Sequence, residues 1–258
     1  MLFAMLAKKN YARNLQYRSS HLVHNVASFI FGFVYVSIWI GIGESNSLGE
    51  YGVKGMITYV AFNQACLWLT LFITNSLGME QSVRTGQISL DLMRPVHLFY
   101  HLMSKEWGQI FYQFVYKFLP IYFIYFFLFS LQVPQQFSTY FWTAIALILA
   151  GYICICINYL IGVVSLWTTE SKWLFWVNYA FSMLLSGFFI PVEWLPGVFY
   201  QLSMYSPYPY IQYYVTRIYL GYESYSVLLG SVAWCIFFTV LCLAATSIMR
   251  KKLEVQGG

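Results

Sequence analysis

The residues of this chain that could carry out chemistry are few and poorly placed for it. His97 and His101 lie four positions apart and could share a helix face, but a metal site needs further ligands, and Glu106 is badly positioned to be one. The five cysteines lie in apolar segments, without metal-ligand spacing to a histidine. The sequence also lacks a phosphate-binding loop, a zinc-protease motif and a nucleophile elbow. We expect no catalytic residue, and no metal or cofactor bound by this chain.

Polar residues that recur at helical spacing are better candidates for a site. They form stripes in three apolar segments. The stripes consist of Asn63, Thr70 and Thr74 with their neighbours Gln64, Trp68 and Asn75, then Asn158, Gly162 and Ser165, and finally Asn178, Ser182 and Ser186. Such stripes either hold helices together or line a cavity, and packing is the default interpretation for each. The last stripe runs into a proline break, which favours a role in lining a path.

The break, residues 186–196, reads Ser-Gly-Phe-Phe-Ile-Pro-Val-Glu-Trp-Leu-Pro. We expect an apolar helix to reach Pro191, to meet a charge at Glu193 and to be stopped again at Pro196. Proline lacks a backbone donor, so a break at membrane depth needs shelter inside protein or contact with water. We interpret Pro191, Glu193, Leu195 and Pro196 as an outer lid over a transport path.

The composition indicates which elements position these residues. The chain is 60% hydrophobic and 9% charged, whereas soluble proteins are about 25% charged. This favours an all-α membrane protein with one transmembrane domain, residues 1–258. A membrane span needs about 20 mostly apolar residues. Six segments qualify, at about 22–42, 57–77, 109–131, 140–166, 173–190 and 227–249.

The basic residues orient these spans. They gather before the first span, between the second and third, at Lys172 and after the sixth, whereas the other side holds Lys54 and Arg217. Both termini are therefore expected in the cytoplasm. Basic residues beside apolar segments do not form a nucleic-acid surface, so the net charge of +5 does not predict one. Apart from Lys117, ionisable residues deep in the spans are nearly absent, which argues against ion-coupled transport and indicates an outside energy source.

Three segments outside the spans have predicted roles. Residues 1–20 form an interfacial helix on the cytoplasmic side, or a solvated lead-in that only sets the topology. Residues 79–107 alternate charges with apolar residues, and therefore present a knob to a soluble partner or only connect two spans. Residues 191–226 are rich in tyrosine, which predicts short re-entrant helices in an extracellular lid, or an ordinary aromatic belt.

Two motifs in this arrangement carry a family resemblance that covers nearly the whole chain. Residues 186–196 resemble the Gly–Phe–x–x–Pro signature, followed by Leu-Pro, of type-2 ABC exporters. Residues 86–95 resemble the cytoplasmic segment that ends in Arg-Pro in one bacterial subfamily of these exporters. With the predicted topology, the chain resembles their membrane (permease) subunit, in the class of drug-resistance and polysaccharide-export permeases.

The resemblance implies a partnership and two sets of site residues. A second copy or a paralogous permease and two cytoplasmic ABC ATPase subunits, which bind ATP and Mg, would complete the transporter in a bacterial cytoplasmic membrane. The residues that touch the ATPase would be Glu80, Arg84, Leu90, Arg94 and Pro95. The substrate path would include Trp68, Asn75, Asn178, Ser182, Ser186, Phe188 and Phe189.

The cargo and one other class of function stay open at this level. An aromatic, uncharged cavity favours an amphiphilic or lipid-like cargo, and a drug, a peptide antibiotic or a lipid-linked glycan are alternatives. A non-transporting membrane scaffold would explain the missing catalytic residues equally well, but not the lid or the cytoplasmic knob. An intramembrane enzyme would need paired catalytic residues, which the sequence lacks.

Overall fold

The computed structural model describes residues 2–16, 18–45 and 47–257, without the side chains of residues 18–21, 45 and 252–257. These residues form helices and no strand, as predicted. The long helices are α2 (Arg18–Ser45), α3 (Gly52–Thr70), α6 (Leu98–Gln113), α7 (Leu119–Phe129), α8 (Phe137–Thr168), α9 (Lys172–Leu185) and α12 (Leu228–Gly257). The short elements are α1 (Leu2–Asn14), η1 (Gly49–Tyr51), η2 (Asn75–Gly78), α4 (Met79–Arg84), α5 (Gln87–Leu92), η3 (Phe114–Phe118), η4 (Val192–Trp194), α10 (Gly197–Met204), η5 (Tyr208–Tyr210), α11 (Tyr213–Leu220) and η6 (Tyr225–Val227).

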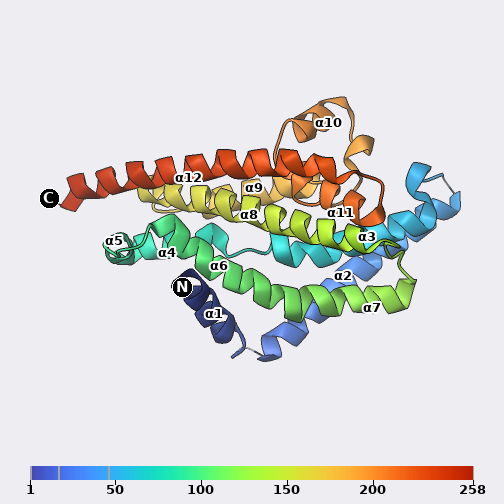
Figure 1. Cartoon of the computed structure of the whole chain (residues 1–258), viewed down its shortest axis with the longest axis horizontal. Coiled ribbons are helices and arrows are strands. Elements are labelled where there is room, and N and C mark those ends of the chain that lie inside the picture. Colours follow the sequence, from blue (N-terminus) through green and yellow to red (C-terminus); the bar gives the residue numbers. More distant parts are fainter. Residues whose placement is uncertain (1, 17, 46, 258) are drawn as a thin grey trace.

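The long helices form a bundle that extends along the longest axis of the molecule (Figure 1). The α4–α5 segment lies toward the end where α12 finishes, and the α2–α3 and α7–α8 connections lie at the opposite end. Helix α3 occupies the core. In the stretch Gly49–Arg84, which contains α3, 89% of the most apolar 18-residue segment is buried. Helix α3 packs against α2, α7, α8 and α11, so the polar stripe on this helix faces protein on every side.

Five helical stretches among the described residues are long and apolar enough to cross a membrane. They are Leu22–Glu44, Gly49–Arg84, Leu98–Phe129, Phe137–Thr168 and Tyr225–Lys251. They confirm the all-α membrane class and correspond to five of the predicted spans. The other predicted span forms α9, whose 14 residues extend about 21 Å, short of the ~30 Å hydrocarbon core. Helix length alone therefore does not establish a sixth crossing.

Helix α9 ends at Leu185, which makes the prediction of a helix reaching Pro191 wrong. Gly187 has a φ of +76°, a left-handed conformation that suits glycine and that a right-handed helix cannot continue. A Cβ at this position would lie 2.8 Å from atoms of both Tyr59 and Tyr213. The glycine, rather than the proline, therefore stops the helix, and residues 186–190 continue as bends.

The third long helix begins earlier than predicted. Helix α6 starts at Leu98, so residues 98–107 of the predicted coupling region 79–107 belong to a helix that runs on through η3 into α7. The π-helical turn η3 lies just before Pro120, which cannot donate a backbone hydrogen bond. This wider turn carries Lys117, whose side chain is buried with its Nζ 3.6 Å from the centre of the Trp68 ring.

The predicted N-terminal helix is present as α1, and it packs along α6. Asn10 donates a hydrogen bond to the carbonyl oxygen of Lys105 at 2.6 Å. Gly108 permits this close approach, because a Cβ there would lie 2.2 Å from the backbone oxygen of Ala7. Leu2, Phe3 and Met5 on α1 remain exposed, as expected for an amphipathic helix.

The segment between α9 and α12 contains short helices in two different settings. Helix α10 projects from the side of the bundle, where most of its residues are exposed (Figure 1). Helix α11 packs against α3 and α8, and its Val215, Thr216 and Ile218 are buried. Of the tyrosines in this segment, Tyr213 and Tyr219 of α11 are buried, whereas Tyr200, Tyr205 and Tyr225 are exposed.

Candidate functional site

The first part of the candidate site is a clamp between α4 and the α8–α9 connection. Oε2 of Glu80 accepts hydrogen bonds from the backbone nitrogen and the Oγ of Ser171, both at 3.0 Å. Ser171 Oγ also lies 2.7 Å from the Oγ of Ser76. Since α9 begins at Lys172, this clamp connects α4 directly to the start of α9.

A tight turn brings α4 to this position. Ser76 and Leu77 have φ values of 51° and 50°, and Gly78 has a φ of 75°. Such left-handed residues are costly for side chains other than glycine, so the surrounding contacts must hold them. Gly162 of α8 provides the space, because a Cβ there would lie 2.6 Å from the backbone oxygen of Ser76. The α8 stripe at this point therefore packs helices together.

The five predicted coupling residues divide into two groups. Glu80 is turned inward, and Arg84 lies 3.8 Å from Glu80 and 3.4 Å from Glu170. Leu90, Arg94 and Pro95 are exposed, and the Leu90 side chain is 58% exposed. Arg94 pairs with Asp91 at 3.0 Å.

Sequence reasoning missed Met93, which is 81% exposed. Exposed apolar side chains beside a charge are typical of a protein contact. The signal was available in the sequence, since the methionine immediately precedes the Arg-Pro pair.

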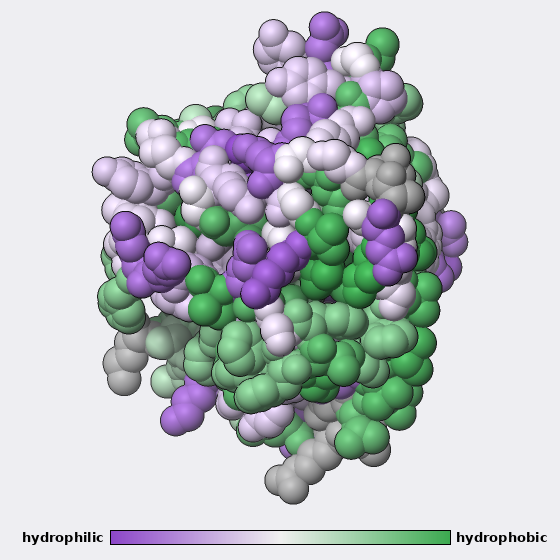
Figure 2. All heavy atoms as spheres, turned by 90° about the vertical axis from the view of Figure 1, so that its right-hand side faces the viewer, coloured by the Kyte–Doolittle hydropathy of each residue, from purple (hydrophilic) through white to green (hydrophobic). Residues whose placement is uncertain are grey.

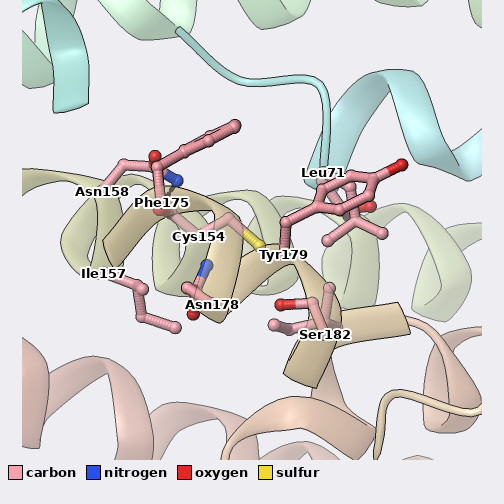
Figure 3. Close-up of a pocket in the computed structure, with 10 residues that line it drawn as sticks. Leu71, Cys154, Ile157, Asn158, Phe175, Asn178, Tyr179 and Ser182 are labelled. Carbon is pink, nitrogen blue, oxygen red and sulfur yellow. Dashed lines mark hydrogen bonds between the residues drawn. The ribbon is translucent and has the colours of Figure 1, made fainter. Parts of the chain in front are cut away.

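The second part of the site is where polar stripes of three helices meet. Figure 3 shows Asn158 of α8 with Asn178 and Ser182 of α9 around one pocket, which Thr70 of α3 also lines. The pocket has a volume of about 10 Å³, room for about one water molecule. Asn178 accepts a hydrogen bond from the hydroxyl of Tyr208 at 3.0 Å. Thr70 accepts a hydrogen bond from the amide of Gln212 at 3.2 Å, so polar residues around the pocket are bonded to neighbouring elements.

The third part is the sheltered break after α9. Its backbone oxygens accept hydrogen bonds from neighbouring elements, as the membrane-depth argument requires. The carbonyl of Gly187 accepts from the hydroxyl of Tyr59 at 2.5 Å and from the amide of Asn63 at 3.2 Å. The carbonyl of Leu185 accepts from Ser203 Oγ at 2.6 Å, and that of Ser186 from the backbone nitrogen of Tyr213 at 2.9 Å.

The predicted path residues are mostly buried. Ser186 is buried, and Phe188 packs in a small cluster with Leu67 and Leu71. Trp68 donates to the Oγ of Ser28 at 3.2 Å. Asn75 lies in the tight turn and accepts from Ser76, so it does not join the others. Phe189 has an exposed ring, 38% accessible, and its carbonyl accepts a hydrogen bond from Tyr35.

The predicted lid is anchored at the end of the bundle that holds η1, where Glu193 and Glu50 pair with the same arginine. Pro191 and Leu195 are buried, whereas Glu193 and Pro196 reach the surface. Figure 2 shows this end face-on, with hydrophilic residues gathered across its upper and central parts and hydrophobic residues covering the lower part.

Arg217 of α11 holds this end together. It pairs with Glu193 at 3.0 Å, with Glu223 at 3.4 Å and with Glu50, and its side chain is only 12% exposed. It also donates to the hydroxyl of Tyr51, which in turn donates to Glu193 at 2.7 Å.

The electrostatics of the Arg217 cluster follow from these partners. Burial alone lowers the pKa of the Arg217 guanidinium, but Tyr213, Tyr51 and Glu50 outweigh it and the pKa lies above its ordinary value. Sequence reasoning missed this residue as a site residue. Its position was a signal, because it is one of few basic residues on the side that the positive-inside rule leaves poor in charge.

These features define a class of protein before any comparison. Among the described residues no three His, Cys, Asp or Glu side chains come close enough to hold a metal ion. The site consists of a clamped surface segment, a sheltered helix break and the charged cluster around Arg217 on a bundle of apolar helices. This arrangement is that of an integral membrane protein.

Comparison with protein families narrows this class of integral membrane proteins to one family. The family model of the ABC-2 family transporter protein matches residues 22–255, and the chain therefore belongs to that family of ABC transporter permeases. Members are non-catalytic membrane subunits, and the family implies partnership with an ABC ATPase. A search of curated proteins finds no match.

Proposed function

We propose that this chain is one permease half of an ATP-driven exporter in a bacterial cytoplasmic membrane. Two ATPase subunits, carrying ATP and Mg, would dock at the end of the bundle that holds α4 and α5. The exposed Leu90, Met93 and Arg94 support this choice of surface. Export rather than import rests on the resemblance of residues 186–196 to the exporter signature.

The proposal includes six crossings with both termini in the cytoplasm. Helix α9 extends about 21 Å, and the five residues from Ser186 to Ile190 add up to about 16 Å when extended. Together they suffice for a core of about 30 Å. The bends of this stretch are acceptable at membrane depth because protein groups donate hydrogen bonds to the carbonyls of Ser186, Gly187 and Phe189.

In the proposed mechanism, a displacement passes along covalent and hydrogen-bonded connections from the α4–α5 end of the bundle to the end that holds the lid. ATP binding closes the two ATPase subunits and pushes on α4 and α5. The Glu80–Ser171 clamp passes the displacement to the start of α9. Gly187, at the other end of α9, takes up the change in direction. The lid then separates from Arg217 at Glu193, while Glu50 and Glu223 keep the arginine paired. This is a two-state gate that a ligand biases.

The path for cargo requires a second permease, the same chain or a paralogue. The pocket between α3, α8 and α9 is too small for any substrate in this state. By contrast α9 turns Trp176 and Phe181 outward, 55% and 44% exposed, and Phe189 continues this face. Aromatic side chains without charges suit an amphiphilic, lipid-like, drug or peptide cargo between two such faces.

The single observation that carries the proposal is the clamp between α4 and α9, and a pull-down tests the docking that it serves. The tagged chain is purified in mild detergent and the eluate is assayed for ATP hydrolysis. Met93→Glu and Arg94→Glu are expected to lose the co-purified ATPase, whereas Lys251→Glu, an exposed basic residue at the end of α12, keeps it. A folded wild-type chain that brings down no ATPase would instead favour a non-transporting scaffold.

A further inference from the structure

A basic pocket lies between α1 and α6, and it shares Arg94 with the candidate site described above. It has a volume of about 580 Å³. Lys9 and Arg13 enter it from α1, Lys105 from α6, and Arg94 from the turn before α6. Four cationic side chains around one cavity repel one another, so the arrangement needs an anion or compensating carboxylates.

The protein itself supplies only part of that compensation. Asp91 pairs with Arg94 at 3.0 Å and lies near enough to attract Lys105. Glu106, near Arg13, is buried and accepts a hydrogen bond from the backbone nitrogen of Thr74 at 2.8 Å. Neither carboxylate lines the pocket. Among the described residues, Lys9, Arg13 and Lys105 make no ion pair, so the pocket keeps an excess of positive charge.

A buried histidine in the same pocket lacks a hydrogen-bond partner. His101 is 4% exposed, and its Nε2 bonds to no group in the described part of the chain. Buried polar atoms normally find a partner, because leaving one unpaired is costly. An anion with oxygen acceptors in the pocket would supply a partner for the protonated ring nitrogen and for the three unpaired cations together.

The surroundings favour a ligand at a membrane surface. Helix α1 carries exposed Leu2, Phe3 and Met5, and Leu6 lines the pocket itself. Apolar and basic faces on one helix are typical of an element in the lipid interface. Basic pockets beside membrane helices bind anionic headgroups.

We propose that the pocket between α1 and α6 binds a phosphate group, supplied by the headgroup of an anionic phospholipid. Bound there, the lipid would bridge α1 to α6 and to the turn that carries Arg94. Binding there requires no ATPase, and the variants used below leave Arg94 unchanged, so the test is independent of the proposed function.

Lipid binding to the purified chain tests the proposal directly. Native mass spectrometry measures the binding of phosphatidylglycerol and of phosphatidylcholine to the wild type and to Lys9→Gln, Lys105→Gln and Lys8→Gln. Lys8 is the matched control, since it is an exposed lysine on α1 that does not line the pocket. One basic residue near a membrane surface contributes about a fivefold change in binding. We expect each pocket variant to bind phosphatidylglycerol about fivefold more weakly, and Lys8→Gln to match the wild type.

The outcomes separate the sources of phosphate. If millimolar inorganic phosphate competes with lipid binding to the wild type but not to Lys9→Gln, the phosphate site is supported. If this competition occurs while the wild type shows no preference for phosphatidylglycerol over phosphatidylcholine, the site is assigned to soluble phosphate. Equal binding of both lipids with no effect of inorganic phosphate overturns the proposal. Equal losses in Lys8→Gln and Lys9→Gln also overturn it, because they indicate general surface charge. Unchanged elution volume and thermal midpoint show that each variant is folded.

Discussion

Removing the carboxylate of Glu80 should loosen the connection between α4 and α9. Two donors of Ser171 lie 3.0 Å from one oxygen of Glu80, and the side chain is 17% exposed. Hydrogen bonds to a charged group contribute about 1.5–3 kcal/mol each. Because the two bonds share one oxygen that retains some contact with water, we expect Glu80→Ala to cost about 2–3 kcal/mol. Glu80→Gln keeps an acceptor and should cost about 1 kcal/mol.

Thermal unfolding in detergent, followed by tryptophan fluorescence, measures this cost. A loss of 2 kcal/mol lowers the midpoint of a chain of this size by about 4–8 °C. Glu170→Ala is the control, since Glu170 is 61% exposed and forms one 3.4 Å pair with Arg84. Exposed pairs contribute about 0–1 kcal/mol. If Glu80→Ala and Glu170→Ala unfold at the same temperature, the clamp does not hold α4 to α9 and the reasoning is refuted.

The remaining predictions concern the charged cluster around Arg217, the break and α1. Arg217→Gln removes the one cation that three carboxylates share, and should destabilise the protein by about 3 kcal/mol in thermal unfolding. Gly187→Ala combines a positive φ with Cβ contacts of 2.8 Å and should lower the free energy of unfolding by about 2 kcal/mol or more. Its control is Gly41→Ala, where a Cβ would meet nothing within 4 Å and the change should be neutral or slightly stabilising. Gly108→Ala should push α1 off α6 and expose it to limited proteolysis; a protected α1 would contradict the packing.

The sequence predicted the membrane class and most of the helices, because long apolar segments have few other stable structures. It misplaced the end of α9, since the proline at 191 was a stronger signal than the glycine at 187. The left-handed conformation of Gly187 depends on Tyr59 and Tyr213 from distant segments. No local pattern could show those contacts.

The candidate site was predictable only in its separate parts. Glu80 was predicted to contact an external partner, and its bond with Ser171, 91 positions away in sequence, had no signal in the sequence. Arg217 was counted only for topology, although three carboxylates from distant segments converge on it. In both cases the function of a charge depends on partners that only the tertiary fold brings together. The exposure of Leu90 and Arg94, by contrast, agrees with the pattern from which they were predicted.

The central claim of the proposal is that a displacement at the α4–α5 segment reaches the end of the molecule that holds Arg217. An environment-sensitive fluorophore on Tyr205→Cys tests it most directly, because Tyr205 directly follows α10 and is 85% exposed. The label is introduced in a Cys235→Ser background, since the other four cysteines are buried. In vesicles that contain the complex with its ATPase, MgATP should change the fluorescence of the labelled protein, and Glu80→Ala should abolish the change while the ATPase stays bound. No response to MgATP, or an undiminished response in Glu80→Ala, would contradict the account.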